Sequence, residues 1–256
     1  MTSTRKLGLA LVWLPFSLFA QWPDYPAARA PRTADGKVRM DAPAPRTADG
    51  HPDFSGVWDR GEPFSLFRAL RSVVTEIPYQ PWAAELAKQR EASGSVGHPD
   101  AHCLPLHPVQ LHTHPYPRKI EQTPTEVIVM YEANGGLRQF FLDGRALPKV
   151  DDDVQPWWYG YSVAHWDGDV LVVESTGFRD DSWLDEGSGA PGTSALKLTE
   201  RITRPVYGRL EISITIDDPK AYTKPFGFKI TQALMPDTQL IEYICAENEQ
   251  SVKHFK

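Results

Sequence analysis

From residue 120 onward, apolar and polar residues alternate with a period of two, the pattern of β-strands that are buried on one face. Two pairs of runs flank the dipeptides Asn134-Gly135 and Asp167-Gly168, which favour tight hairpin turns. The expected strands are 126–132, 137–142, 162–166, 169–174, 196–203, 209–217, 229–235 and 239–245. The last two are expected to pair across Pro236-Asp237. The order of these runs predicts consecutive hairpins.

Consecutive hairpins favour a mainly β fold, either a closed antiparallel barrel or a tightly rolled sandwich. Gly56 and Trp58, two residues apart at the start of the first expected strand, are typical of a calycin, or lipocalin-like, barrel. Only one short helical segment is expected, with Pro81 in its first turn before residues 82–90. We therefore predict a single antiparallel lipocalin-like barrel over residues 53–256.

The first twenty residues have the pattern of a secretion signal. Arg5 and Lys6 precede an apolar run that ends at Ala20, and this run is shorter than the roughly 20 residues that span a bilayer. The prediction is a signal peptide over residues 1–20 and export to the periplasm or the outside of the cell. No second long apolar run follows, so we expect no integral membrane segment after signal removal.

A lead-in rich in Pro and Ala follows at residues 21–52. It contains the tandem repeat APRTADG at 30–36 and 44–50. We expect an extended, polyproline-II-like strap that lies on the barrel domain or spaces it from the membrane.

Composition narrows the choice of partners. Hydrophobic residues make up 41% of the chain and the formal net charge is −6. An acidic protein without clustered Lys and Arg is a poor partner for nucleic acid, so we expect no nucleic-acid partner and a small-molecule ligand or substrate instead. In an oxidising compartment, Cys103 and Cys245 are expected to form one disulfide that ties a His-rich segment to the C-terminal segment.

A set of motifs spread over most of residues 45–254 resembles a family of exported proteins found in Acidobacteria and some Proteobacteria. The motifs are PRTADG (45–50), PDFSGVW (52–58), CLPL (103–106), QTP (122–124), LDGR (142–145), HWDGDVLVV (165–173), TER (199–201), DDP (217–219), YTKP (222–225) and EYICAEN (242–248). The resemblance implies an exported β-rich domain and no particular activity. Members of the family usually have glycine after the CLPL stretch, where this chain has His107.

Five of the eight histidines fall between residues 98 and 114. If residues 112–114 form a strand, His112 and His114 lie on one face and, with His107, form a candidate site for a divalent metal. The competing interpretation is a Pro-rich surface loop, and we expect no cofactor.

Acid–base chemistry without a metal is the second possibility. His165 on the best-defined strand, Asp143 and Arg145 at a turn, and the pair His112 and His114 are the candidate catalytic residues. Turn geometry alone also explains Asp143, because Asp-Gly is a common turn dipeptide.

Aromatic residues are dense between residues 157 and 183. Such rings suit a flat phenolic, terpenoid or sugar ligand, or else they plug the barrel. The candidate ligand-binding residues are Trp157, Trp158, Tyr159, Tyr161, Trp166 and Trp183.

These observations lead to three functional hypotheses. The first is an exported, cofactor-independent enzyme of the isomerase, lyase or hydrolase type that acts on a small hydrophobic, phenolic or sugar-like molecule in a barrel pocket. The second is a periplasmic, lipocalin-like binding protein without catalysis. The third is a metal-dependent enzyme that uses the histidines between residues 98 and 114.

Overall fold

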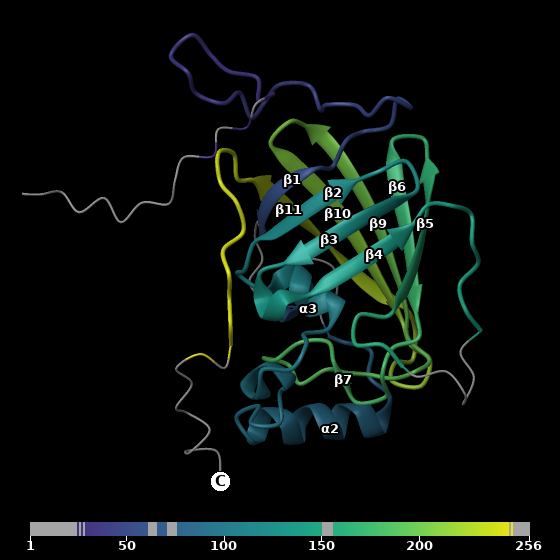
Figure 1. The fold of residues 1–256 in the computed structure, drawn as a ribbon. Coiled ribbons are helices and arrows are strands. Elements are labelled where there is room, and N and C mark those ends of the chain that lie inside the picture. Colours follow the sequence, from purple (N-terminus) through teal and green to yellow (C-terminus); the bar gives the residue numbers. More distant parts are fainter. Residues whose placement is uncertain are drawn as a thin grey trace, which may run out of the picture.

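The computed structural model describes residues 25, 27, 29–60, 66–70, 76–149, 156–245 and 247. The expected signal peptide lies outside the described residues. The main feature is a closed barrel with the strand order β1-β11-β10-β9-β6-β5-β4-β3-β2 (Figure 1). Its strands are β1 (Gly56–Arg60), β2 (Arg118–Gln122), β3 (Glu126–Tyr131), β4 (Leu137–Phe141), β5 (Tyr161–Asp167), β6 (Val170–Thr176), β9 (Lys197–Val206), β10 (Arg209–Asp217) and β11 (Phe226–Leu234). Two short strands, β7 (Ser182–Trp183) and β8 (Pro191–Gly192), pair outside the barrel.

The prediction of a purely antiparallel barrel was wrong at one place, because β4 and β5 run parallel. The reason is geometric: a ring with an odd number of strands cannot alternate direction all the way round. The parallel pairing is short and joins only Phe140 to Ser162 and Phe141 to Val163. We call this place, between β4 and the start of β5, the seam.

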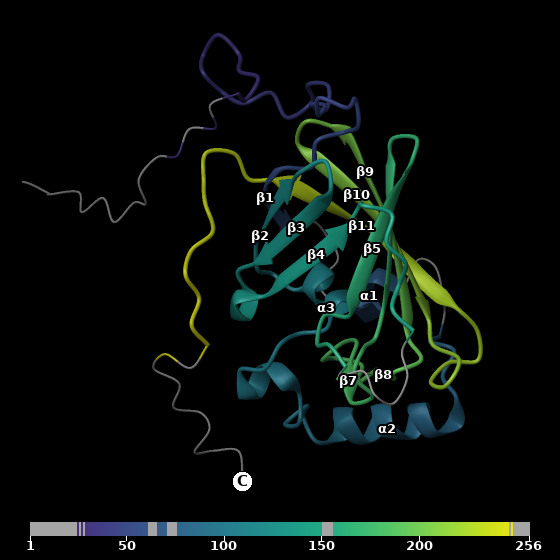
Figure 2. The same ribbon diagram turned by 45° about the vertical axis from the view of Figure 1, so that its right-hand side comes forward.

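The predicted hairpins β3–β4, β5–β6 and β9–β10 are confirmed as antiparallel pairs. The predicted strand at 239–245 was wrong, because residues 239–244 have no regular secondary structure. The edge of β11 that such a strand would need is already paired with β1, which closes the barrel. The C-terminal segment instead runs along the outside of the barrel, as the yellow trace shows in Figures 1 and 2.

The helix predicted after Pro81 is confirmed as α2 (Pro81–Ala92). The expectation of one helical segment was too low, because the structure also contains α1 (Leu66–Leu70), α3 (Pro108–Thr113) and short 3₁₀ turns at Pro99–His102 and Ala133–Gly135. In both views α3 lies at the lower opening of the barrel and α2 lies beneath it (Figures 1 and 2).

The two copies of the repeat in the lead-in (residues 29–52) fold into the same turn. In each copy the arginine side chain donates to the carbonyl of the closing glycine, Arg32 to Gly36 at 2.9 Å and Arg46 to Gly50 at 2.7 Å. The same arginines form ion pairs with the barrel domain, Arg32 with Asp237 and Arg46 with Asp169. The lead-in is not the straight polyproline-II strap that was expected, because each copy of the repeat folds into a turn. It lies across the upper end of the barrel in Figure 1.

The disulfide predicted between Cys103 and Cys245 is present. It links the segment before α3 to the C-terminal segment across 142 residues of sequence. In the part of the chain that the structure describes, no helix has the length and apolar character needed to cross a membrane.

Candidate functional site

Helix α3 places His112 inside the barrel. Pro108 occupies the first turn, where its missing N–H costs nothing, and the Nδ1 atom of His107 caps the helix by accepting from Val109 N at 3.2 Å. All six residues of α3 are buried. The expectation of a strand through residues 112–114 was therefore wrong, because residues 108–113 form a helix that lies at the barrel opening. The alternative of a surface loop was wrong for the same six residues.

The side chain of His112 binds Glu200 on β9. Nε2 of His112 lies 2.5 Å from Oε1 of Glu200, and both side chains are buried. Arg138 on β4 donates to the same carboxylate through two nitrogens, Nη1 to Oε1 at 3.0 Å and Nη2 to Oε2 at 2.5 Å. One carboxylate thus connects α3 to β9 and β4, two strands that are separated in the barrel by β6 and β5.

The protonation states follow from this arrangement. Burial alone would raise the pKa of Glu200, but the charge of Arg138 and the hydrogen bonds from His112 and Arg138 outweigh it and hold that pKa well below its usual range. Burial lowers the pKa of His112 despite the opposing effect of Glu200. The carboxylate is therefore ionised and the imidazole neutral, with its proton on Nε2 and a lone pair on Nδ1.

Nδ1 of His112 is buried and has no hydrogen-bond partner among the described residues. A neutral imidazole whose other nitrogen is fixed by a carboxylate is the arrangement that general bases use in enzymes. The carboxylate sets the tautomer and stabilises the imidazolium that forms when Nδ1 takes up a proton.

The hydrogen-bond network continues from Arg138 towards the seam. Nη2 of Arg138 lies 3.3 Å from the Ser175 hydroxyl, which lies 2.7 Å from the Ser162 hydroxyl. We call His112, Glu200, Arg138, Ser175 and Ser162 the buried polar network.

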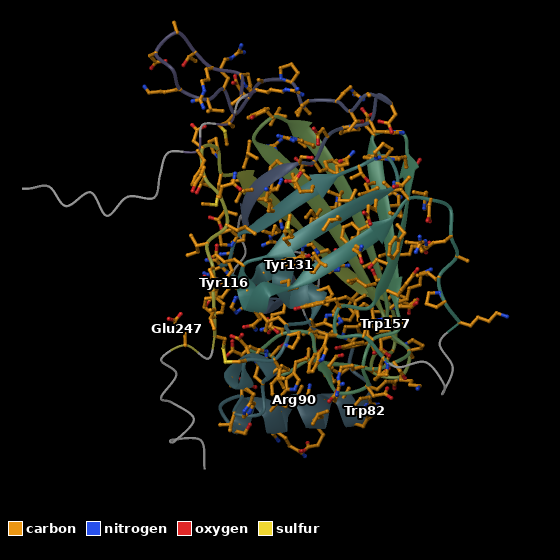
Figure 3. All side chains as sticks on the ribbon, viewed as in Figure 1. Trp82, Arg90, Tyr116, Tyr131, Trp157 and Glu247 are labelled. Carbon is orange, nitrogen blue, oxygen red and sulfur yellow. A yellow bond between two sulfur atoms is a disulfide. The ribbon has the colours of Figure 1, made fainter. Side chains whose placement is uncertain are left out.

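A pocket of about 660 Å³ lies at the seam. Its lining includes Arg138 and Ser162 of the buried polar network. The lining also contains the aromatic side chains of Phe141, Trp157, Trp158, Tyr159 and Tyr161. Figure 3 shows Trp157 at the lower right of the barrel, away from Tyr131 in the strands that face the viewer. The structure thus brings four of the six aromatic candidates together in one pocket.

The other two aromatic candidates lie elsewhere. Trp166 stacks on His51 of the lead-in, with ring centroids 4.3 Å apart. Trp183 is buried in β7, where the guanidinium of Arg90 lies 4.0 Å from its ring centroid. Neither residue lines the aromatic pocket.

The candidate His165 points away from the barrel interior. It is exposed on β5, while its neighbours Ser162 and Ala164 are buried. Asp143 and Arg145 form an ion pair of 2.5 Å near the pocket, where Nη1 of Arg145 lies 3.1 Å from the hydroxyl of Tyr161. These two residues lie beside the pocket wall and not in the buried polar network.

The three histidines proposed as metal ligands each make a different contact. His107 caps α3, His112 binds Glu200, and His114 stacks on Tyr116 with ring centroids 4.9 Å apart. Among the described residues, no group of three or more His, Cys, Asp or Glu side chains is placed to hold a metal ion.

Sequence reasoning missed Glu200 and Arg138 as partners of His112. A signal was present, because Glu200 stands between Leu198 and Ile202 at an inward position of an alternating strand, where an apolar residue is normal. A carboxylate at such a position needs a buried partner.

No protein-family model matches this chain, and a search of curated proteins finds no similar sequence.

Proposed function

We propose that this protein is an exported, cofactor-independent enzyme that transfers protons to and from a small molecule at the buried polar network, with His112 as the general base. The observation that carries the proposal is the unpartnered Nδ1 atom of His112, in a ring that Glu200 holds in one tautomer. The barrel belongs, in this proposal, to the calycin type, in which the interior of the barrel receives the ligand.

The proposed reaction begins when Nδ1 of His112 removes a proton from a carbon or hydroxyl group of the substrate. The electron pair left on the substrate either forms a new double bond and expels a leaving group, or accepts the same proton at another atom. The first course is an elimination, typical of a lyase, and the second is an isomerisation. Glu200 stabilises the imidazolium formed during the step, and Arg138 keeps Glu200 ionised.

The pocket at the seam supports a small, flat substrate. Its volume is within the range of sites that bind small molecules, and its aromatic lining suits phenolic, terpenoid or sugar-like rings. Arg138 contributes both to the lining and to the hydrogen bonds on Glu200. His112 itself is not part of that lining, so the proposed reaction requires the substrate to reach past Arg138 into the barrel interior.

The test uses p-coumarate, geraniol and xylose as probes of the three ligand types. Each is incubated with the protein in D₂O and followed by NMR for loss of C–H signals or for new resonances. We expect turnover of at least one probe, and a loss of about 100-fold or more in His112→Gln, since a general base contributes roughly 10²–10⁴-fold.

The matched control is His165→Gln, which removes an exposed imidazole on the outer face and is expected to keep the full rate. If a probe binds but is recovered without exchange or conversion, the protein is a binder. Equal loss of turnover in both variants would also contradict the assignment of His112.

A binding protein without catalysis is the second candidate. The observation that favours it is the aromatic lining of the pocket, because aromatic side chains can hold a ring-shaped ligand without any catalytic group. In that case Trp157→Ala and Trp158→Ala lower the affinity for a bound probe, and no probe is converted.

A further inference from the structure

Arg118 is a buried charge that makes no hydrogen bond in the part of the chain that the structure describes. It lies on β2 and is 1% exposed. None of its three guanidinium nitrogens has a hydrogen-bond partner among the described residues. The ring of Tyr131 is nearby, with its centroid 5.8 Å from the guanidinium carbon. A buried cation without hydrogen bonds is costly, and proteins normally pair such a group with an anion.

The buried charges of the barrel strands do not balance. The buried charged side chains on these strands, in the part of the chain that the structure describes, are Arg118, Arg138, Arg204 and Glu200. Arg138 is neutralised by Glu200, and Arg204 donates to the carbonyl oxygens of Asp53 and Tyr207. Arg118 forms no hydrogen bond among the described residues, and Asp59 and Glu200 act on its charge only without direct contact, although the whole chain has a formal net charge of −6.

Other unpartnered polar atoms lie on the same inner face. Gln232 on β11 is 1% exposed, and both its amide oxygen and its amide nitrogen lack partners among the described residues. Strand β1 separates the two residues: Arg118 is opposite Trp58, and Gln232 is opposite Arg60. The charge of Arg118 also acts on His112, since it contributes to the lowering of the pKa of that imidazole. Arg118 and Gln232 thus lie on the inner wall of the barrel on either side of β1, and Arg118 is near enough to His112 to act on its charge.

We propose that Arg118 binds the carboxylate of the substrate inside the barrel, so that the substrate is a small organic acid with an apolar or aromatic body. The planar guanidinium matches a carboxylate through two parallel hydrogen bonds. Gln232 is placed on the same inner face to donate a further hydrogen bond from its amide nitrogen. The statement that the bound acid is a substrate rests on the proposed function. The anion site itself can be tested by binding alone, without any turnover.

The test is isothermal titration calorimetry of the full chain with benzoate and with its neutral isostere benzamide. We expect benzoate to bind at least about tenfold more tightly than benzamide, as charge-assisted hydrogen bonds are the stronger kind. Arg118→Met is expected to bring benzoate affinity down to that of benzamide and, without ligand, to raise the melting temperature. The matched control is Arg201→Met, which removes an exposed arginine paired with Asp167 and is expected to leave benzoate affinity unchanged.

A second variant and a spectroscopic measurement keep the proposal open to contradiction if Arg118→Met does not fold. Arg118→Lys retains the charge but loses the planar pair of donors, and it is expected to bind benzoate several-fold more weakly. In the unchanged protein, benzoate is expected to shift the guanidinium ¹⁵N resonances that are assigned to Arg118 by their absence from Arg118→Lys. Equal affinity for benzoate and benzamide, or unchanged affinity in both Arg118 variants, would overturn the proposal.

The two proposals fail separately. If benzoate binds at Arg118 but no probe is ever converted, the acid–base enzyme is contradicted and the anion site stands. If a probe is converted through His112 but benzoate shows no preference over benzamide, the enzyme stands and the anion site is contradicted.

Discussion

Gly160 lies so close to the ring of Phe178 that a β-carbon at position 160 would stand 2.5 Å from ring atom Cε1. Its φ angle of +70° also lies in the left-handed region that favours glycine. Gly160 lines the pocket at the seam, directly before β5 begins at Tyr161. The backbone can therefore follow this path along one wall of the pocket because residue 160 has no side chain.

Replacing Gly160 with alanine is expected to lower the free energy of unfolding by more than about 2 kcal/mol, because backbone strain and overpacking against Phe178 add together. Urea unfolding measures the loss. The matched control is Gly144→Ala, where φ is +78° but no heavy atom lies within 4 Å of the added carbon. That variant should lose only about 1 kcal/mol, and equal losses at the two positions would contradict the close packing of Phe178 on Gly160.

The buried ion pair predicts a large effect of a small change at Glu200. Glu200→Gln leaves the buried Arg138 without its counter-charge, and we expect a loss of about 3–5 kcal/mol in the free energy of unfolding. Chemical denaturation checks this value. Glu174→Gln serves as the comparison, since its pair with Lys197 is partly exposed and is worth about 1 kcal/mol or less.

The protonation of His107 predicts a dependence of stability on pH. Burial is the main cause that lowers the pKa of His107 from 6.5 to about 3. In the unfolded chain His107 takes up a proton below pH 6.5, while the folded protein keeps it neutral down to about pH 3. Stability is therefore lost as the pH falls through this window, at a rate of up to about 1.4 kcal/mol per pH unit from this group.

His107→Asn isolates that contribution, because asparagine is a good helix cap but does not titrate. Unfolding curves at several pH values between 7 and 4 should show a smaller loss of stability in the variant than in the unchanged protein. Parallel pH profiles would mean that His107 is protonated in the fold.

The disulfide predicts a clear response to reduction. Cys103→Ser together with Cys245→Ser is expected to lower the free energy of unfolding by about 2–5 kcal/mol, since the bridge closes a loop of 142 residues. A thiol reductant should destabilise the unchanged protein by a similar amount. The reductant should have no effect on the double variant, and an effect there would point to a cause other than the bridge.

Local signals in the sequence were sufficient for much of the wall of the barrel. Asn134-Gly135 and Asp167-Gly168 mark turns between consecutive strands, and the pairing across each turn needs no information from distant residues. Pro81 likewise marks the first turn of α2. The pairing of Cys103 with Cys245 could be predicted because the chain contains only two cysteines.

The buried polar network could not be predicted in this way, because its contacts join distant parts of the chain. His112 and Glu200 are 88 residues apart, and Arg138 reaches Glu200 over 62 residues. Helix α3 is short and buried on every side, so it shows no alternation between an apolar and a polar face. The sequence indicated a concentration of histidines but not which of them would meet a carboxylate.

The parallel pairing at the seam has a consequence for how this protein can vary. Two antiparallel neighbours are joined by a tight turn whose length fixes their register, but a parallel pair requires a connection that travels the length of the strands. The chain between Phe141 and Tyr161 has this task, and it carries Trp157 and Trp158. Insertions, deletions and exchanges of rings in that connection can therefore reshape the pocket at the seam while the tight turns keep the register of the antiparallel strands.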